Sequence, residues 1–292
     1  MDVTPRPRIA ELSASTTVVG VIGDPVAHSL SPHLHNTAFS AMGLDWVSVG
    51  FRVRAGRAAE ALVGARALGV RGLSVTMPHK EAVAALVDRR TPSATQLGAV
   101  NCVATTDDGW LGDNTDGPGF VASLRNRAAF DPEGERCLVV GAGGAARAVI
   151  AGLGGAGAAE VIVVNRSPER AAAAAALAGV AGRVGAPSDV GDCSLVVNAT
   201  PLGMADTGDA DAAWPIDPAL LHEGQTVIDL VYHPRVTPWM DAASARGAVV
   251  ANGVGMLVYQ AALQIGRWTG QEPPVEAMWR AVSGPAAGQR WG

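Results

Sequence analysis

A single lysine, Lys80, ends the segment Ser74-Val-Thr-Met-Pro-His-Lys80, and all the rest of the 22 Lys and Arg residues are arginines. The two cations differ in their chemistry, because Arg is effectively never deprotonated whereas Lys can pass a proton. A compositional preference for Arg explains why lysine is scarce. It does not explain why the one lysine follows an apolar strand beside Ser74, Thr76 and His79. We therefore predict that Lys80 is a catalytic acid and base.

A glycine-rich turn, Gly141-Ala-Gly-Gly-Ala-Ala146, lies between an apolar strand at 136–140 and a helix expected at 147–153. Glycines let the backbone approach a pyrophosphate, and a helix start offers unpaired N–H groups and the positive end of its dipole. The spacing is one step from the dinucleotide fingerprint, so the turn alone is a weak signal. Its place between strand and helix predicts phosphate binding by Gly141, Ala142, Gly143, Gly144 and Ala145.

The end of the following strand bears on the choice of cofactor. A site for the unphosphorylated ribose usually has an acidic residue there. Here Val164 is followed by Asn165, Arg166 and Ser167, with Arg170 one turn later. Two guanidinium groups and two hydrogen-bonding side chains suit a phosphate. The sequence therefore favours NADP over NAD, with a solvated helix start as the alternative reading of the two arginines.

The elements that must position these residues alternate between strands and helices, which is typical of an α/β fold. A helix over 31–42 is expected to have Ser31 as its N-cap, followed by Pro32 in the first helical position. Pro78 is expected to open the helix that carries Lys80. Strands are expected at 17–22, 46–53, 72–76, 100–105 and 110–112, the last two forming a hairpin, with a further helix at 57–68.

The middle of the chain indicates a second α/β unit. Strands are expected at 136–140, 160–164, 194–198, 226–230 and 248–251, and the alanine run 171–178 is expected to be an ordinary crossover helix. Helices at 255–267 and 275–282 have no strand of their own, so they should return to the first domain. We predict a two-domain fold, with an N-terminal α/β substrate domain of residues 1–117 and 254–292 and a Rossmann-like doubly wound NADP domain of residues 118–253.

Composition excludes several classes of protein. The net charge of -5 and the lack of a basic cluster argue against nucleic acid as a partner. The apolar region Cys137–Val164 is broken by glycines and charges, and Met1–Ala10 does not resemble a signal peptide, so we expect no membrane span and a cytoplasmic protein. Three widely spaced cysteines, Cys102, Cys137 and Cys193, are expected to be small buried residues in a reducing compartment.

Other polar residues are assigned structural roles. His28, His33 and His35 lack a Cys or acidic partner at ligand spacing, so we expect no metal. His79 is expected at the surface, and Asp113 is expected to support the turn that precedes Asp116.

Several separated motifs make the chain, from about Val18 to about Trp268, resemble the shikimate dehydrogenases. The resemblance implies NADPH-dependent reduction of 3-dehydroshikimate to shikimate, a step of chorismate and aromatic amino acid biosynthesis, by a monomer or homodimer. The motifs are Gly23–Pro32, Ser74–Lys80, Gly98–Asn101, Gly112–Gly117, Gly141–Ala146, Asn165–Ser167, Asn198–Met204 and Asn252–Gln260.

The family resemblance also implies roles for single residues. Lys80 and Asp116 would form the catalytic pair, the ammonium giving a proton to the developing alkoxide. Ser29, Ser31 and Tyr232 would contact the substrate carboxylate. The ring hydroxyls would be held by Ser74, Thr76, Asn101, Asp116 and Gln260, and the ribose or nicotinamide of the cofactor would lie near Thr200, Val231, Gly253 and Met256.

Ser74 departs from the family pattern, because many members have Asn at this ring-hydroxyl position. This difference leaves the exact substrate preference open, including a paralogue that acts on an aminated shikimate analogue. The nearest alternative within the class is a quinate/shikimate dehydrogenase that uses NAD, and Asn165 and Arg166 argue against it. A non-catalytic NADP-sensing module is the alternative from another class, and the presence of both Lys80 and Asp116 argues against it.

Overall fold

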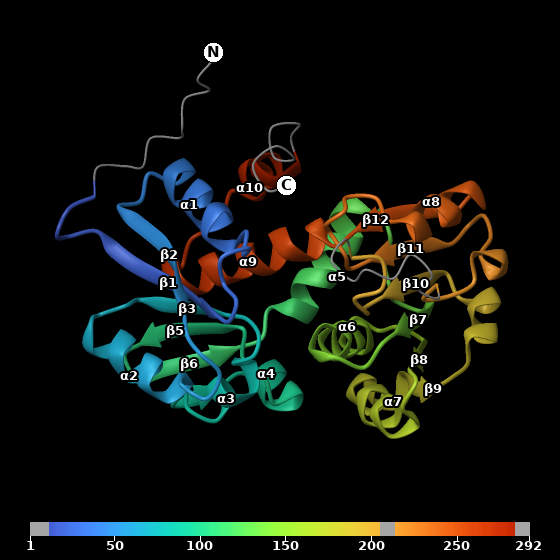
Figure 1. Cartoon of the computed structure of the whole chain (residues 1–292), viewed down its shortest axis with the longest axis horizontal. Helices are drawn as coiled ribbons and strands as arrows, with labels where there is room; N and C mark the ends of the chain where they lie inside the picture. Colours follow the sequence, from blue (N-terminus) through green and yellow to red (C-terminus); the bar gives the residue numbers. More distant parts are fainter. Residues whose placement is uncertain (1–11, 205–213, 284–292) are drawn as a thin grey trace, which may run out of the picture. The chain divides into compact units, whose positions relative to one another are not determined.

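The computed structural model describes residues 12–204 and 214–283. The segment Met1–Ala10, on which the expectation about a signal peptide depends, lies outside the described residues. The chain divides into two compact units: unit 1 is Met1–Asp113 with Ala261–Gly292, and unit 2 is Asn114–Gln260. Each unit is built on its own six-stranded sheet, which confirms the predicted two-domain α/β fold (Figure 1).

The sheet of unit 1 has the strand order β2-β1-β3-β5-β6-β4. Strands β1, β2 and β3 are parallel, whereas β5 runs antiparallel to both β3 and β6. The pair β5–β6 is the predicted hairpin. The elements are β1 (Thr17–Gly23), α1 (Ser31–Ala41), β2 (Trp46–Arg52), α2 (Ala58–Ala67), β3 (Gly72–Val75), α3 (Lys80–Ala84), β4 (Arg89–Arg90), α4 (Pro92–Leu97), β5 (Cys102–Thr106) and β6 (Gly109–Asp113).

The C-terminal helices complete unit 1, as the sequence predicts. Helix α9 (Val254–Thr269) ends in this unit, and α10 (Val275–Ser283) packs against α1, where His33 Nε2 lies 3.3 Å from the Ala281 carbonyl oxygen. The Trp268 indole of α9 lies directly on Gly72 of β3, where an added Cβ would come within 2.3 Å of the ring. Only glycine at this position lets α9 approach the sheet so closely.

The sheet of unit 2 is entirely parallel, in the order β12-β11-β10-β7-β8-β9. Strand order reverses between β7 and β10, so the turn after β7 lies at a topological switch point, where open α/β sheets bind ligands. The elements are α5 (Asp116–Arg127), β7 (Arg136–Val140), α6 (Gly144–Gly155), β8 (Glu160–Val164), α7 (Pro168–Ala175), β9 (Gly182–Val184), β10 (Leu195–Asn198), β11 (Thr226–Asp229), α8 (Pro238–Ala245) and β12 (Val249–Asn252).

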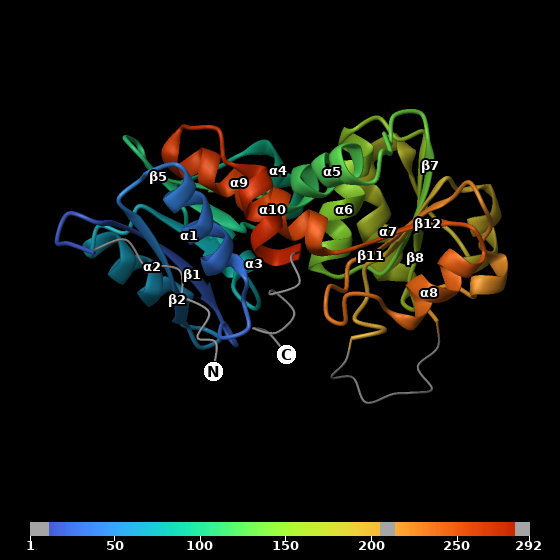
Figure 2. The same cartoon turned by 90° about the horizontal axis from the view of Figure 1, so that it is seen from above.

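Successive side chains of β7 point to opposite faces of the sheet and pack into two separate hydrophobic cores. Cys137 and Val139 pack with α5, α6 and α7, whereas Leu138 and Val140 pack on the other face with Trp239 of α8. Figure 2 shows α6 and α8 on opposite sides of this sheet. A parallel sheet covered on both faces needs apolar side chains at successive positions, which is why its strands are continuous apolar runs in the sequence.

Two helix predictions need correction. Ser31 is the first residue of α1 rather than its N-cap; the cap position is Leu30, which has helical backbone angles and makes no side-chain cap. The alanine run does not form one helix to 178, because α7 ends at Ala175 and a 3-10 helix follows over Ala176–Ala181. Gly179 interrupts that segment with φ of 63°. Alanine favours a helix but cannot extend it through a glycine in the left-handed region.

The three cysteines are buried and free, as expected from the sequence. Burial raises the pKa of the Cys137 thiol to about 12 and that of Cys193 to about 11, so both remain protonated and unreactive. Within residues 12–204 and 214–283, no helix combines the length and apolar character needed to cross a membrane.

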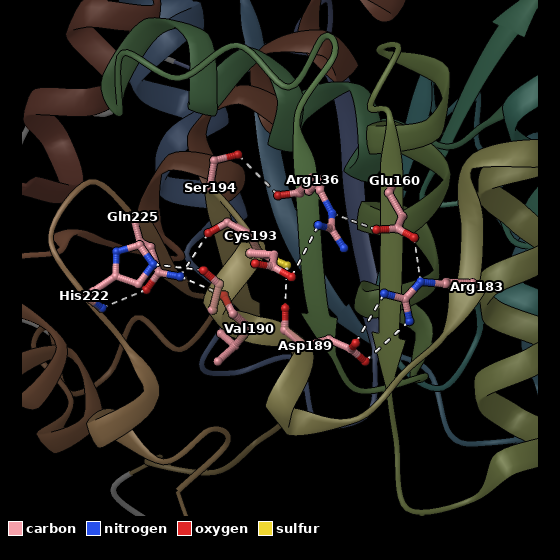
Figure 3. Close-up of polar contacts among 11 residues, drawn as sticks. Arg136, Glu160, Arg183, Asp189, Val190, Cys193, Ser194, His222 and Gln225 are labelled. Atoms are coloured by element: carbon pink, nitrogen blue, oxygen red, sulfur yellow. Dashed lines mark hydrogen bonds and ion pairs between the residues drawn. The ribbon is translucent and has the colours of Figure 1, made fainter.

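A polar network braces the amino-terminal edge of the unit 2 sheet (Figure 3). Glu160 accepts hydrogen bonds from Arg136 Nε at 2.9 Å and Arg183 Nε at 2.5 Å, and Arg183 also pairs with Asp189. These contacts, with that of Arg183 first, lower the pKa of the Glu160 carboxyl. The network ties together the first residues of β7 and β8 and the middle of β9, at the edge opposite the glycine turn.

Further along the same edge, Gln225 is a fully buried amide directly before β11. Its Nε2 donates to the carbonyl oxygens of Val190 and Cys193 at 2.8 and 2.9 Å, and its Oε1 accepts from the backbone N–H of His222 at 3.0 Å. The imidazole of His222 lies between two carbonyl oxygens, with Nδ1 2.6 Å from Glu223 O and Nε2 3.1 Å from Gly191 O. Both ring nitrogens can donate only when the ring is protonated, so these contacts raise the pKa of His222.

We expect this histidine to make folding stability depend on pH. Because its folded-state pKa is raised, the stabilisation is complete below the ordinary value of 6.5 and is lost as pH rises through the folded-state value. Between about pH 5 and about pH 8, the Tm of the wild type should fall by about 1–2 °C more than the Tm of His222→Gln. The expected difference is small because the ring is exposed to solvent. His28→Gln, which also changes an exposed histidine, is the control; equal slopes for all three proteins would contradict the assignment.

Candidate active site

The predicted substrate residues of unit 1 gather at one edge of its sheet. Ser29 and Ser31 follow the carboxyl end of β1, and Thr76 and Lys80 follow that of β3, a neighbouring parallel strand. Asn101 precedes β5, which runs antiparallel to β3, so it comes to the same edge. The edge is shared because parallel strands end on the same side and an antiparallel strand begins there.

The Lys80 segment differs from the prediction in two details. Helix α3 begins at Lys80 itself, and Pro78 lies in the turn before it. His79 is buried at 1% exposure, with Nε2 2.7 Å from the carbonyl oxygen of Val53, so its expected surface position is wrong. His79 lies in the turn before α3 and not on the helix, and the turn directs its imidazole into the interior of unit 1. Lys80 is half-buried, and its carbonyl oxygen accepts from the Val100 N–H at 2.9 Å.

Asn101 is fixed from three sides. Its carbonyl oxygen accepts from the Val75 N–H at 2.8 Å and from Gln264 Nε2 of α9 at 3.1 Å, and its N–H donates to the Asp113 carbonyl oxygen at 3.0 Å. The bonds at Val75 and Val100 bring Thr76, Lys80 and Asn101 together.

The Asp113 carboxylate bonds residues at the start of α4 and in α9, whereas the sequence predicted that it supports the turn before Asp116. It accepts from Thr91 Oγ1 at 2.6 Å, Ser93 Oγ at 3.0 Å and Arg267 Nε at 2.8 Å. The C-terminal helix α9 therefore supports the β6 end of this edge through Arg267.

The remaining predicted substrate residues of unit 1 are Ser29, Ser31, Ser74 and Thr76. Ser29 Oγ accepts from the Ser31 N–H at 3.3 Å, which orients the loop that enters α1. Ser74 is buried within β3, and Thr76 is half-buried beyond the strand end.

In unit 2, Asp116 is the first residue of α5 and is buried. Its N–H donates to Asn114 Oδ1 at 3.2 Å, and the adjacent Thr115 donates through Oγ1 to the Gln260 carbonyl oxygen at 3.1 Å. Asp116 and Gln260 are therefore brought together within this unit. Tyr232 follows β11 and is 39% exposed.

The glycine turn is shorter than predicted, because α6 begins at Gly144 and includes Ala145 and Ala146. Gly141 has φ of 114°, a conformation that favours glycine, and its N–H donates to the carbonyl oxygen of Val164 at 2.8 Å. A Cβ added to Gly143 or Gly144 would meet no atom within 4 Å, so the start of α6 has an open approach.

The segment after β8 carries the predicted arginines. Arg166 and Arg170 are exposed. Asn165 Nδ2 donates to the Ser167 carbonyl oxygen at 3.1 Å, and Ser167 caps α7. Sequence reasoning missed Glu169, whose carboxylate accepts from Ser167 Oγ at 2.9 Å. Glu169 lies in the first turn of α7, a position where an acidic side chain favours the helix dipole.

The other predicted cofactor residues follow β10, β11 and β12. Thr200 lies against the glycine turn, since a Cβ on Gly141 would be 3.2 Å from its Cγ2. Val231 is buried, and its carbonyl oxygen accepts from the Gly253 N–H at 3.3 Å. Met256 is partly buried against the core beneath α6. These residues and the turn therefore share the carboxyl edge of one sheet.

This edge fits a phosphorylated dinucleotide. The open helix start after Gly143 suits a pyrophosphate, and the exposed guanidinium groups of Arg166 and Arg170 suit the 2′-phosphate. Across the described ranges, no group of three or more His, Cys, Asp and Glu is placed to hold a metal ion.

A parallel sheet with a glycine turn at its switch point and arginines after the next strand defines the class of NADP-dependent oxidoreductases. Three family models match along the chain: the shikimate dehydrogenase substrate binding domain over residues 21–103, shikimate / quinate 5-dehydrogenase over 124–185, and the shikimate 5'-dehydrogenase C-terminal domain over 253–282. A shikimate dehydrogenase (NADP(+)) of Citrifermentans bemidjiense is 47% identical over 283 residues, which cover 93% of this chain and 96% of that relative. The chain belongs to the shikimate dehydrogenase family.

Solved structures agree with this membership. A shikimate dehydrogenase crystallised in complex with NADP+ has a TM-score of 0.87 at 35% identity, covering 95% of this chain and 98% of that chain. A shikimate 5-dehydrogenase from Thermus thermophilus, in complex with NADP(H) and shikimate, has a TM-score of 0.83 at 37% identity and covers 91% and 98% of the two chains.

Proposed function

We propose that this protein catalyses the reversible, NADPH-dependent reduction of 3-dehydroshikimate to shikimate. The observation that carries the proposal is the gathering of Thr76, Lys80 and Asn101 at one edge of the unit 1 sheet. A proton donor beside hydrogen-bonding side chains suits a ketone whose ring carries several hydroxyl groups. Membership of the family supports the same substrate and cofactor.

In the proposed reaction, bound NADPH supplies the hydride to the carbonyl carbon. The Lys80 ammonium gives its proton to the carbonyl oxygen as negative charge develops there, and the Asp116 carboxylate orients the ammonium and the new hydroxyl. In the reverse direction, the neutral amine of Lys80 takes the proton from the hydroxyl.

The proposed substrate contacts divide by chemistry. Ser29, Ser31 and Tyr232 hold the carboxylate, where hydroxyl groups donate to an anion. The ring hydroxyls are held by Ser74, Thr76, Asn101, Asp116 and Gln260, whose fixed donors and acceptors disfavour analogues that lack a hydroxyl. In this assignment the substrate contacts other than Tyr232 belong to residues 1–117 and 254–292, and the cofactor contacts other than Met256 belong to residues 118–253.

The proposed cofactor contacts begin at the glycine turn and end at α9. Backbone groups of 141–145 hold the pyrophosphate, and Asn165, Arg166, Ser167 and Arg170 hold the 2′-phosphate. Thr200, Val231, Gly253 and Met256 line the ribose and nicotinamide.

Arg166→Ala should raise the KM for NADP by about tenfold or more, because it removes a charge-assisted hydrogen bond to phosphate, and should change the KM for NAD little. Initial rates with each cofactor measure this difference. Arg246→Ala, which removes a guanidinium that bonds the carbonyl oxygens of Leu221 and Ala219 elsewhere in unit 2, is the matched control. Equal changes in the two KM values for Arg166→Ala would refute the 2′-phosphate role.

The proposed function is tested by nicotinamide absorbance with shikimate and quinate, each paired with NADP and NAD. We expect rapid turnover only with shikimate and NADP. A preference for quinate or NAD would favour the quinate/shikimate alternative, and turnover only with an aminated analogue would favour the paralogue that Ser74 leaves open. Binding of NADPH without any turnover would favour a sensing module.

We further propose a cytoplasmic monomer or homodimer. Buried free thiols at Cys102, Cys137 and Cys193 fit a reducing compartment. Light scattering at several concentrations would distinguish the two oligomeric states.

A further inference from the structure

Two polar side chains are completely buried where adjacent strands of the unit 2 sheet end. Asn198 is the last residue of β10 and Asp229 the last of β11, and the two are paired directly across the parallel strands. Both have 0% exposure, and Asn198 Nδ2 donates to Asp229 Oδ1 at 2.9 Å. A buried carboxylate and a buried amide are costly unless their polar atoms find partners.

Asn198 finds its partners in the loop that follows its own strand. Its Oδ1 accepts from both the N–H and the Oγ1 of Thr200, at 3.0 and 2.6 Å, and its Nδ2 also donates to the Leu202 carbonyl oxygen at 3.2 Å. One side chain therefore fixes both the backbone and the hydroxyl of Thr200.

Asp229 does the same for the neighbouring loop. Its Oδ1 accepts from the Val231 N–H at 3.1 Å, and its Oδ2 accepts from Thr237 Oγ1 at 2.7 Å. Thr237 in turn caps α8 by accepting from the Met240 N–H at 3.3 Å. Burial raises the pKa of the Asp229 carboxyl, and the bonds from Thr237, Val231 and Asn198 oppose that rise.

We propose that Asn198 and Asp229 form a positioning pair, which sets Thr200 and Val231 at the geometry that the nicotinamide end of NADP requires. This inference extends the proposed function, since those two residues are the proposed contacts. The pair lies at the edge that carries the glycine turn, and Thr200 and Val231 are themselves next to Gly141 and Gly253. A ligand site is held most accurately when buried hydrogen bonds lock the residues that line it, because a displacement of about 1 Å can lower a rate by about 100-fold.

The test compares variants at this edge with a matched variant at the opposite edge of the same sheet. Asn198→Ala should raise the Kd for NADPH, measured by fluorescence titration, about tenfold. It should lower kcat more strongly than it changes the KM for shikimate, and increase the primary deuterium isotope effect on kcat. Gln225→Ala removes an equally buried amide with three hydrogen bonds before β11, and should lower the Tm by a similar amount with an unchanged Kd and kcat.

Conservative variants separate positioning from general stability. Asp229→Asn keeps an acceptor for Val231 and can still bond Thr237, so it should retain the wild-type Kd, whereas Asp229→Ala should not. If the alanine variants do not fold, Asn198→Ser, whose shorter hydroxyl cannot reach both groups of Thr200, should show the same rise in Kd.

Equal Kd and kcat changes in the Asn198 and Gln225 variants would overturn the positioning role. If wild-type protein binds NADPH but does not oxidise shikimate, the proposed function fails. The positioning role is then still decided by comparing the Kd for NADPH of Asn198→Ala with that of Gln225→Ala.

Discussion

Replacing Lys80 by alanine should lower kcat for shikimate oxidation by about 10²–10⁴-fold while leaving the Kd for NADPH unchanged. The expected loss is that of a general acid and base, because no other group at the β3 edge of unit 1 is proposed to move a proton. Lys80 starts α3, and its backbone is tied to Val100, so the change removes the ammonium without removing that tie. Steady-state rates and a fluorescence titration of NADPH provide the two measurements.

Lys80→Arg is the informative companion variant. It keeps a positive charge but cannot release the proton, so its kcat should fall nearly as far as that of the alanine variant. Because the chain has a single lysine, ¹⁵N-lysine labelling gives one side-chain signal, which should shift when shikimate is added. Turnover above about a tenth of the wild-type rate in Lys80→Ala would exclude it as the proton donor.

Asp116→Asn is expected to lower kcat by about 100-fold, the second-largest effect. The amide keeps the shape of the side chain at the start of α5, but it no longer offers a carboxylate to orient an ammonium and a hydroxyl. The loss should appear mainly in kcat, with a smaller rise in the KM for shikimate. Initial rates over a range of shikimate concentrations separate the two constants.

Asp131→Asn is a suitable control, since this exposed carboxylate of unit 2 accepts from Arg125 and from the Glu133 N–H, both near it in sequence. It should leave kcat within about twofold of the wild type, as expected for an exposed ion pair. An Asp116→Asn variant with the same kcat as this control would rule out a catalytic role for Asp116.

The central strands of unit 2 could be predicted because they are buried along most of their length. Glu160–Val164 and Arg136–Val140 are continuous apolar runs bounded by turns, and both strands have the predicted bounds. The hairpin was predictable from Asp107-Asp108-Gly109, since this turn chemistry is local. The C-terminal helices have no strand of their own, so they were predicted to pack on an existing domain. The contact of the Trp268 indole with Gly72 shows that α9 packs closely on the sheet of unit 1.

The features that sequence reasoning missed depend on residues far apart in the chain. His79 is buried because Val53, 26 residues away, offers a carbonyl oxygen at 2.7 Å. Asn198 and Asp229 meet only through the register of β10 on β11, which no local pattern specifies. Ser31 has the residue type of an N-cap, but the helical backbone of Leu30 places the start of α1 one residue earlier than a cap at Ser31 requires.

The amino edge of the unit 2 sheet carries a structural ion-pair network, whereas its carboxyl edge carries the proposed ligand contacts. This separation affects how such an enzyme can evolve. Arg136, Glu160 and Arg183 hold the amino edge, about 16 Å along a five-residue strand from the glycine turn. Substitutions in that network can adjust heat tolerance without disturbing the residues proposed to contact ligands. A descendant could therefore adapt to a new growth temperature through one edge while its inherited chemistry stays unchanged at the other.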